Sequence, residues 1–212
     1  MNRRRTAWCG LIVVLPLAGC AGPAGTGEGT AAPSPSATPA DPATVAERAG
    51  SYGVVPEYVL TIDVEGLTAI SHAGGAYGAD GYSAVLADAS TGAAVMVSAV
   101  AGGITAGSCA DLPVLTTSGS TADGPVECRT DGEMFHRTAG DVQEYAVERD
   151  GALVRVSGSG VEAEVLRAAL ESVRVPTADE LDTLLPPLSG PVERGDLPPG
   201  DGAPDNSVGR GG

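Results

Sequence analysis

Two side chains in the second half of the chain are of types that can move protons. Glu127 and His136 flank an Asp-Gly pair at 131–132. If Asp-Gly forms the two-residue turn of a hairpin, Glu127 faces His136 across the two strands. A carboxylate that contacts an imidazole can act with it as acid and base. The same pair also fits an ordinary cross-strand surface contact, which we favour, so Glu127 and His136 are weak candidates for a site.

The first residues have the features of a leader for export. Three arginines at 3–5 precede an apolar run over about residues 7–17. A helix of about 11 residues reaches roughly 16 Å, whereas a bilayer core needs about 20 apolar residues, so the run is too short to span a membrane. A basic start, a short apolar core and small residues before the cut are typical of a secretory signal peptide, here residues 1–19.

The leader closes with Leu17-Ala18-Gly19-Cys20. This tetrapeptide resembles the lipobox of bacterial lipoproteins, and the resemblance covers only the first 20 residues. It implies cleavage between Gly19 and Cys20 and a diacylglycerol thioether on the Cys20 sulfur. Two acyl chains hold a protein stably on a membrane, whereas one chain holds it only marginally. An ordinary signal peptide with an accidental cysteine is the alternative.

Cys109 and Cys128 are the cysteines that follow the lipobox. Export brings them to an oxidising compartment, where such a pair is expected to form a disulfide. The bond would close a loop of about 18 residues and contribute on the order of 3 kcal/mol in the loop-entropy model. In the register given above, Phe135 lies opposite Cys128. The chain has no Cys-x-x-Cys motif, so the pair is not predicted to be redox-active.

Missing residues and motifs exclude several classes of enzyme. The chain has no lysine, and therefore no Walker-type lysine, no Schiff base and no Ser-x-x-Lys acylation site. With two histidines and no His-Glu-x-x-His, it is predicted to bind no metal and no other cofactor. Asp63, Glu65 and His72 could share a metal only if a hairpin over 58–72 aligned them. Adjacent strand residues point to opposite faces, which argues against a Ser71–His72 dyad.

The overall charge restricts the partners. The net charge is −15, and cleavage of the leader would remove three arginines but no acid. So acidic a chain repels nucleic acid, whose binding needs basic side chains. Aromatic residues make up 3% of the chain, too few for stacking platforms. We interpret the acidity as solubility and spacing from the membrane, with recruitment of a basic partner as the alternative. The use of arginine alone for basic residues indicates GC-rich codons and an actinobacterial source.

Composition divides the mature chain into three parts. Residues 20–50 hold the lipidated cysteine and a Pro/Ala-rich stretch that is predicted to be a disordered tether, with a short helix at 44–49 as an option. Residues 51–185 suffice for one domain with one core. Residues 186–212 are rich in Pro, Gly and Asp and are predicted to form a disordered acidic tail that lacks the ligand spacing of a calcium loop.

Alternating apolar residues and turn signals predict strands across the domain. The expected pairs are 58–65 with 67–72, 81–89 with 93–100, 126–130 with 133–138, and 141–149 with 152–157. A second Asp-Gly turn at 150–151 places Val147 opposite Val154 and Tyr145 opposite Val156 on a buried face. The other face of this hairpin, which carries Glu144 and Arg155, is expected to be largely wet.

Two helices are predicted after the strands. An amphipathic helix over 161–173 is indicated by an apolar stripe at spacings of three and four, which consists of Val161, Val165, Leu166, Ala169, Leu170 and Val173. Thr177 and Glu180 form a capping box for a second helix that ends near Leu185. Strands followed by a packing helix predict an α+β fold, an antiparallel β-meander packed by a C-terminal amphipathic helix.

These patterns predict a lipoprotein on the outer face of the cytoplasmic membrane. We expect a non-enzymatic binding or interaction module that is held to the membrane by its lipid. Its partner would be an envelope protein or a small apolar ligand such as a lipid, enclosed between the sheet and the helix at 161–173. A cell-envelope hydrolase, with a site assembled in three dimensions, and a purely structural envelope protein are the alternatives.

Overall fold

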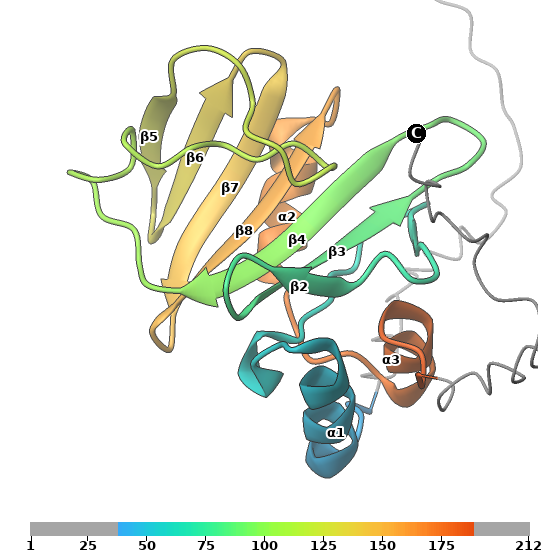
Figure 1. Cartoon of the computed structure of the whole chain (residues 1–212). Helices are drawn as coiled ribbons and strands as arrows, with labels where there is room; N and C mark the ends of the chain where they lie inside the picture. Colours follow the sequence, from blue (N-terminus) through green and yellow to red (C-terminus); the bar gives the residue numbers. More distant parts are fainter. Residues whose placement is uncertain (1–37, 189–212) are drawn as a thin grey trace, which may run out of the picture. The chain divides into compact units, whose positions relative to one another are not determined.

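The α+β fold is confirmed by a computed structural model of the chain, which describes residues 38–188. An eight-stranded antiparallel sheet carries helices on one side (Figure 1). The elements, in chain order, are α1 (Pro42–Tyr52), the 3-10 helix η1 (Pro56–Tyr58), β1 (Thr68–Ala69), β2 (Gly75–Tyr77), β3 (Gly81–Ala87), β4 (Ala94–Ala101), β5 (Glu127–Asp131), β6 (Met134–Ala139), β7 (Val142–Arg149), β8 (Ala152–Ser159), α2 (Ala163–Glu171) and α3 (Ala178–Leu184).

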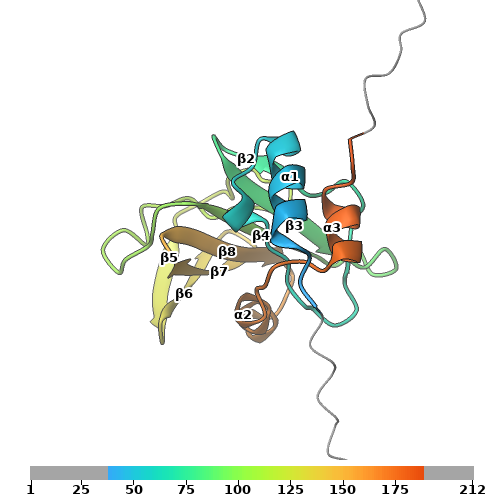
Figure 2. The ribbon, with the colours of Figure 1, turned by 90° about the horizontal axis from the view of Figure 1, so that it is seen from below.

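The sheet has two differently covered faces. Its strand order is β1-β3-β4-β8-β7-β6-β5, and β2 also pairs with β3. Helix α2 packs against one face, while the long connection from β4 to β5 crosses the other face (Figures 1 and 2). We call this connection, residues 102–126, the strap. Side chains alternate between the two faces along each strand. Every second residue therefore faces the helices, and the residues between them face the strap.

The β7–β8 hairpin has the predicted register. Val147 lies opposite Val154, and Tyr145 lies opposite Val156. Asp150 and Gly151 take positive φ angles of 51° and 77°, as a two-residue type I′ turn requires. The Asp-Gly pair therefore set the pairing of these two strands.

The predicted register of the β5–β6 hairpin is wrong by two residues. Glu127 lies opposite Thr138, and His136 lies opposite Arg129. The turn is formed by residues 132 and 133, with Asp131 still in the strand. Gly132, at the first turn position, has a φ of 62°, which matches the Gly-first pattern of a type II′ turn. Cys128 consequently faces Arg137, where Phe135 was expected.

The predicted hairpin of 58–65 with 67–72 does not form. The extended part of the first segment makes a single bridge, in which the backbone of Thr61 bonds that of Arg174. Thr68 and Ala69 pair with β3 instead. The local turn forms, since Leu67 N–H donates to Val64 O at 3.1 Å, but the two arms pair with other segments: the first lies beside the chain that leaves α2, and the second lies beside β3.

The main core lies between the sheet and the helices. Leu166, Ala169 and Leu170 of α2 are almost fully buried and fill the space over β7 and β8. Burial of one such leucine side chain stabilises the fold by about 1.5–3 kcal/mol.

The folded domain includes residues before 51. Helix α1 starts after Asp41, whose carboxylate accepts hydrogen bonds from the N–H groups of residues 43 and 44. Val45 and Ala49 of α1 are buried in the main core. Residues 42–50, which were assigned to the tether, thus belong to the domain. Across residues 38–188, we find no helix with the length and apolar character needed to cross a membrane.

Candidate functional site

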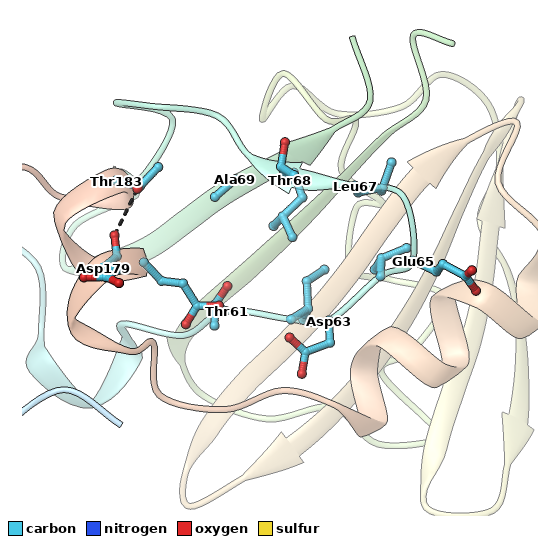
Figure 3. Close-up of a pocket in the computed structure, with 12 residues that line it drawn as sticks. Thr61, Asp63, Glu65, Leu67, Thr68, Ala69, Asp179 and Thr183 are labelled. Carbon is cyan, nitrogen blue, oxygen red and sulfur yellow. Dashed lines mark hydrogen bonds between the residues drawn. The ribbon is translucent and has the colours of Figure 1, made fainter. Parts of the chain in front are cut away.

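A groove of about 560 Å³ runs between the extended segment 61–69 and helix α3 (Figure 3). Thr61, Asp63 and Glu65 follow one another along the segment, while Asp179 and Thr183 lie on α3 at the other side. Apolar side chains and carboxylates share the lining, which consists of Thr61, Ile62, Asp63, Val64, Glu65, Leu67, Thr68, Ala69, Leu86, Asp179, Glu180 and Thr183.

The two walls of the groove are joined by Arg174. Its Nη2 atom lies 2.7 Å from Asp63 Oδ1 and 2.7 Å from Glu180 Oε1, so one guanidinium ties the segment to the helix. The backbone of Arg174 also exchanges hydrogen bonds of 2.9 and 3.1 Å with Thr61. Ser172 Oγ accepts a further bond from the Asp63 N–H. The groove is therefore fixed in width by several bonds.

The groove keeps an excess of negative charge. Arg174 offsets the charges of Asp63 and Glu180, and its hydrogen bonds lower the pKa of Glu180 to about 2. Glu65 and Asp179 are exposed, and within residues 38–188 neither makes an ion pair. Two carboxylates thus remain beside an apolar floor that includes Ile62 and Leu86, both buried. This combination suits a ligand that has an apolar part and a cationic part.

The predicted acid–base pair is not brought together as a facing pair. The Glu127 side chain is 72% exposed and lies 3.8 Å from Arg129. The His136 ring stacks on Tyr145 with 4.9 Å between centroids, and its Nε2 lies 3.1 Å from Gln143 Oε1. Both side chains point to the same face of the sheet, but they are diagonal neighbours.

The possible metal ligands, Asp63, Glu65 and His72, are not brought together as a metal site either. His72 takes a φ of 61° and donates its backbone N–H to Thr183 O, in a loop after β1. Asp63 is held by Arg174. In the part of the chain that the structure describes, no three His, Cys, Asp or Glu side chains are grouped to hold a metal ion. Gly19 and Cys20, with the rest of the leader, lie outside the described residues.

The predicted disulfide is confirmed. Cys109, in the strap, is joined to Cys128 of β5, and their Cα atoms are 6.1 Å apart. Cys109 is fully buried and Cys128 is half-buried. The bond fastens the middle of the strap to the edge of the sheet.

The strap covers charged residues that the sequence placed in water. Arg137 and Glu144 form an ion pair in which both side chains are 0% exposed, and Arg155 beside them is also buried. Burial raises the pKa of the Glu144 carboxyl, against the effect of the two arginines, and lowers the pKa of Arg137. Charged residues that alternate along a strand usually mark a wet face, so no sequence pattern indicates that this cluster is buried.

We compared the chain with protein-family models, with curated proteins and with solved structures, and none of the three comparisons found a match.

Proposed function

We propose that this protein is a lipid-anchored, extracytoplasmic binding module without catalytic activity. In this proposal, the groove between segment 61–69 and α3 holds a cationic, partly apolar segment of an envelope protein. The observation that carries the proposal is the pairing of an apolar floor with two carboxylates that have no ion-pair partner within residues 38–188. The lipobox resemblance of Leu17–Cys20 supports a position on the outer face of the cytoplasmic membrane.

The location of the charge favours a cationic partner over a small apolar ligand. Glu65 lies at one end of the groove and Asp179 at the other, so a basic segment laid along the groove would have a carboxylate near each end (Figure 3). Opposite charges also raise the rate of encounter with a basic partner. A purely apolar ligand would leave both carboxylates without a partner and would gain only from the floor. The groove therefore supports recruitment of a basic partner, which is the alternative interpretation of the acidity of the chain.

A peptide titration tests the proposal. The mature chain with Cys20→Ser would be titrated into a fluorescein-labelled peptide of alternating leucine and arginine, with anisotropy as the readout. We expect saturable binding, and we expect Glu65→Gln with Asp179→Asn to weaken it by about twofold to tenfold, since an exposed ion pair contributes about 0.2–1 kcal/mol.

A matched variant separates the groove from general charge. Glu47 and Asp123 are exposed and lie outside the groove, so Glu47→Gln with Asp123→Asn changes the net charge equally. This control should bind the peptide as the unaltered protein does. Equal weakening by both double variants, or no binding by the unaltered protein, would refute the proposed site.

A further inference from the structure

Charged side chains of the sheet hold the backbone of the strap. Arg137 donates through Nε to Cys109 O at 3.1 Å and through Nη2 to Leu112 O. Arg155 Nη1 donates to Pro113 O at 3.3 Å. In the other direction, the backbone N–H of Leu115 donates to Glu144 Oε2 at 3.3 Å. The apolar contacts of the strap are limited to two small clusters, separate from the main core.

The closed strap leaves part of this polar layer unsatisfied. Arg155 Nε and the hydroxyls of Ser98 and Ser157 are buried, and none has a hydrogen-bond partner in the part of the chain that the structure describes. Ser98 lies directly opposite Arg155, and Ser157 lies two residues further along the same face. The guanidinium groups of Arg137 and Arg155 also lie near only one carboxylate, that of Glu144. Each of these features makes burial costly, because a buried polar group without a partner loses its hydration.

The cost of burying these polar groups therefore offsets part of the gain from the buried apolar residues of the strap. A buried ion pair gains about as much from attraction as it loses in hydration. If the strap lifted, water would reach Arg155, Ser98 and Ser157 and would hydrate the ion pair. The Cys109–Cys128 bond opposes this opening, because it limits how far the strap can move from β5.

From this balance we infer that the strap is a thiol-controlled cover over the polar face of the sheet. A dithiol reductant breaks the Sγ–Sγ bond: two electrons and two protons pass to Cys109 and Cys128, and the reductant becomes a disulfide. Cys128 is the sulfur that the reductant reaches, since Cys109 is fully buried. The strap then opens, while α2 and the main core stay in place because none of their contacts involves the bond. This inference is independent of the groove.

Amide hydrogen exchange, read by mass spectrometry, tests the inference. The mature chain with Cys20→Ser would be compared before and after dithiothreitol, with the reduced thiols verified by intact mass. We expect exchange over 104–123 to become at least tenfold faster, while β7, β8 and α2 keep their protection. Unchanged exchange over 104–123 in the reduced protein would overturn the inference, and so would equal loss of protection throughout the domain.

Two variants address the cause of opening. Cys109→Ser with Cys128→Ser should show the fast exchange without any reductant. Ser98→Ala with Ser157→Ala removes two unsatisfied hydroxyls, so exchange over 104–123 in the reduced protein should slow by at least threefold. Ser83 faces Ser98 but is only half-buried, and Ser83→Ala should have no such effect. An equal rate in the reduced Ser98→Ala, Ser157→Ala variant and the reduced parent would show that unsatisfied polar groups do not drive opening.

Discussion

At the scale of single residues, Arg174 connects parts of the domain that are distant in sequence. It bonds Asp63, which lies 111 positions earlier, and Glu180, six positions later. The Thr177–Glu180 capping box was predictable because it is a local pattern, and the structure confirms it. The contact with Asp63 was not predictable, because no sequence rule places an arginine beside a carboxylate on another segment.

The bond between Arg174 and Glu180 makes the free energy of unfolding depend on pH. The pKa of Glu180 falls from an ordinary 4.5 to about 2 in the folded protein, so the contribution of this carboxylate is complete above pH 4.5. It is lost as the pH falls from 4.5 towards 2. Glu180→Gln should therefore lower stability at pH 7 and reduce the loss between pH 5 and pH 3. The side chains of Arg174 and Glu180 are 26% and 31% exposed, so water still screens the pair and the effect should stay near or below about 1 kcal/mol.

Urea unfolding at pH 7, 5 and 3 measures this effect. Glu47→Gln is a suitable control, because Glu47 is exposed and forms no ion pair within the described range 38–188. If the Glu180→Gln protein and the parent lost stability in parallel over this range, the assigned role of Glu180 would be wrong.

At the scale of elements, the two Asp-Gly hairpins show what local pattern can determine. Both registers considered for β5–β6 put the same residues on the same face, because they differ by two positions and side chains alternate with a period of two. The hydrophobic pattern therefore cannot distinguish them. Glycine accepts positive φ at either turn position, so Gly132 allowed a turn one residue later than the motif indicated.

Helix α2, in contrast, could be predicted because its hydrophobic pattern fits only one structure. Its apolar stripe has a period that only a helix satisfies, and Leu166, Ala169 and Leu170 are buried as expected. Val165 belongs to the predicted stripe but is 39% exposed, because the sheet contacts a narrower part of the helix than the pattern suggested.

Alanine substitutions in α2 should show this difference in burial as a difference in stability. Leu170 is fully buried, so Leu170→Ala is expected to destabilise the domain by about 2–5 kcal/mol. Val165→Ala, one turn away on the exposed side, should cost less than about 1 kcal/mol. Thermal unfolding followed by circular dichroism measures both. Similar losses for the two variants would mean that α2 packs with a different face.

At the scale of the whole molecule, the fold class could be predicted, but the covering of the sheet could not. Glu144 and Arg155 alternate with apolar residues as they would on a wet face, and only the strap makes that face a buried one. The strap itself is rich in Gly, Ser and Thr, and its composition carries no periodic signal. Its position depends on the disulfide and on contacts between distant segments.

The position of the protein in the cell is predicted from the leader. Cys20→Ser should leave the leader uncleaved by the lipoprotein peptidase and remove the diacylglycerol, since the thiol is the group that receives it. We expect intact mass to show a protein that keeps its leader and carries no lipid. Cys9→Ser, within the predicted leader, is the control and should change neither cleavage nor lipidation. A Cys20→Ser protein that is still cleaved at the same position and still carries the lipid would exclude the lipobox assignment.

The way in which the two ends of the described domain are joined has a mechanical consequence. Ala40 N–H bonds Pro176 O at 2.8 Å, and the Arg48 side chain bonds Leu185 O and Asp182. If Cys20 is anchored, a pull on the chain from the membrane reaches these contacts before it reaches any strand. Tension would then break these hydrogen bonds one after another and separate α1 from α3. The sheet would bear force only after these bonds had broken.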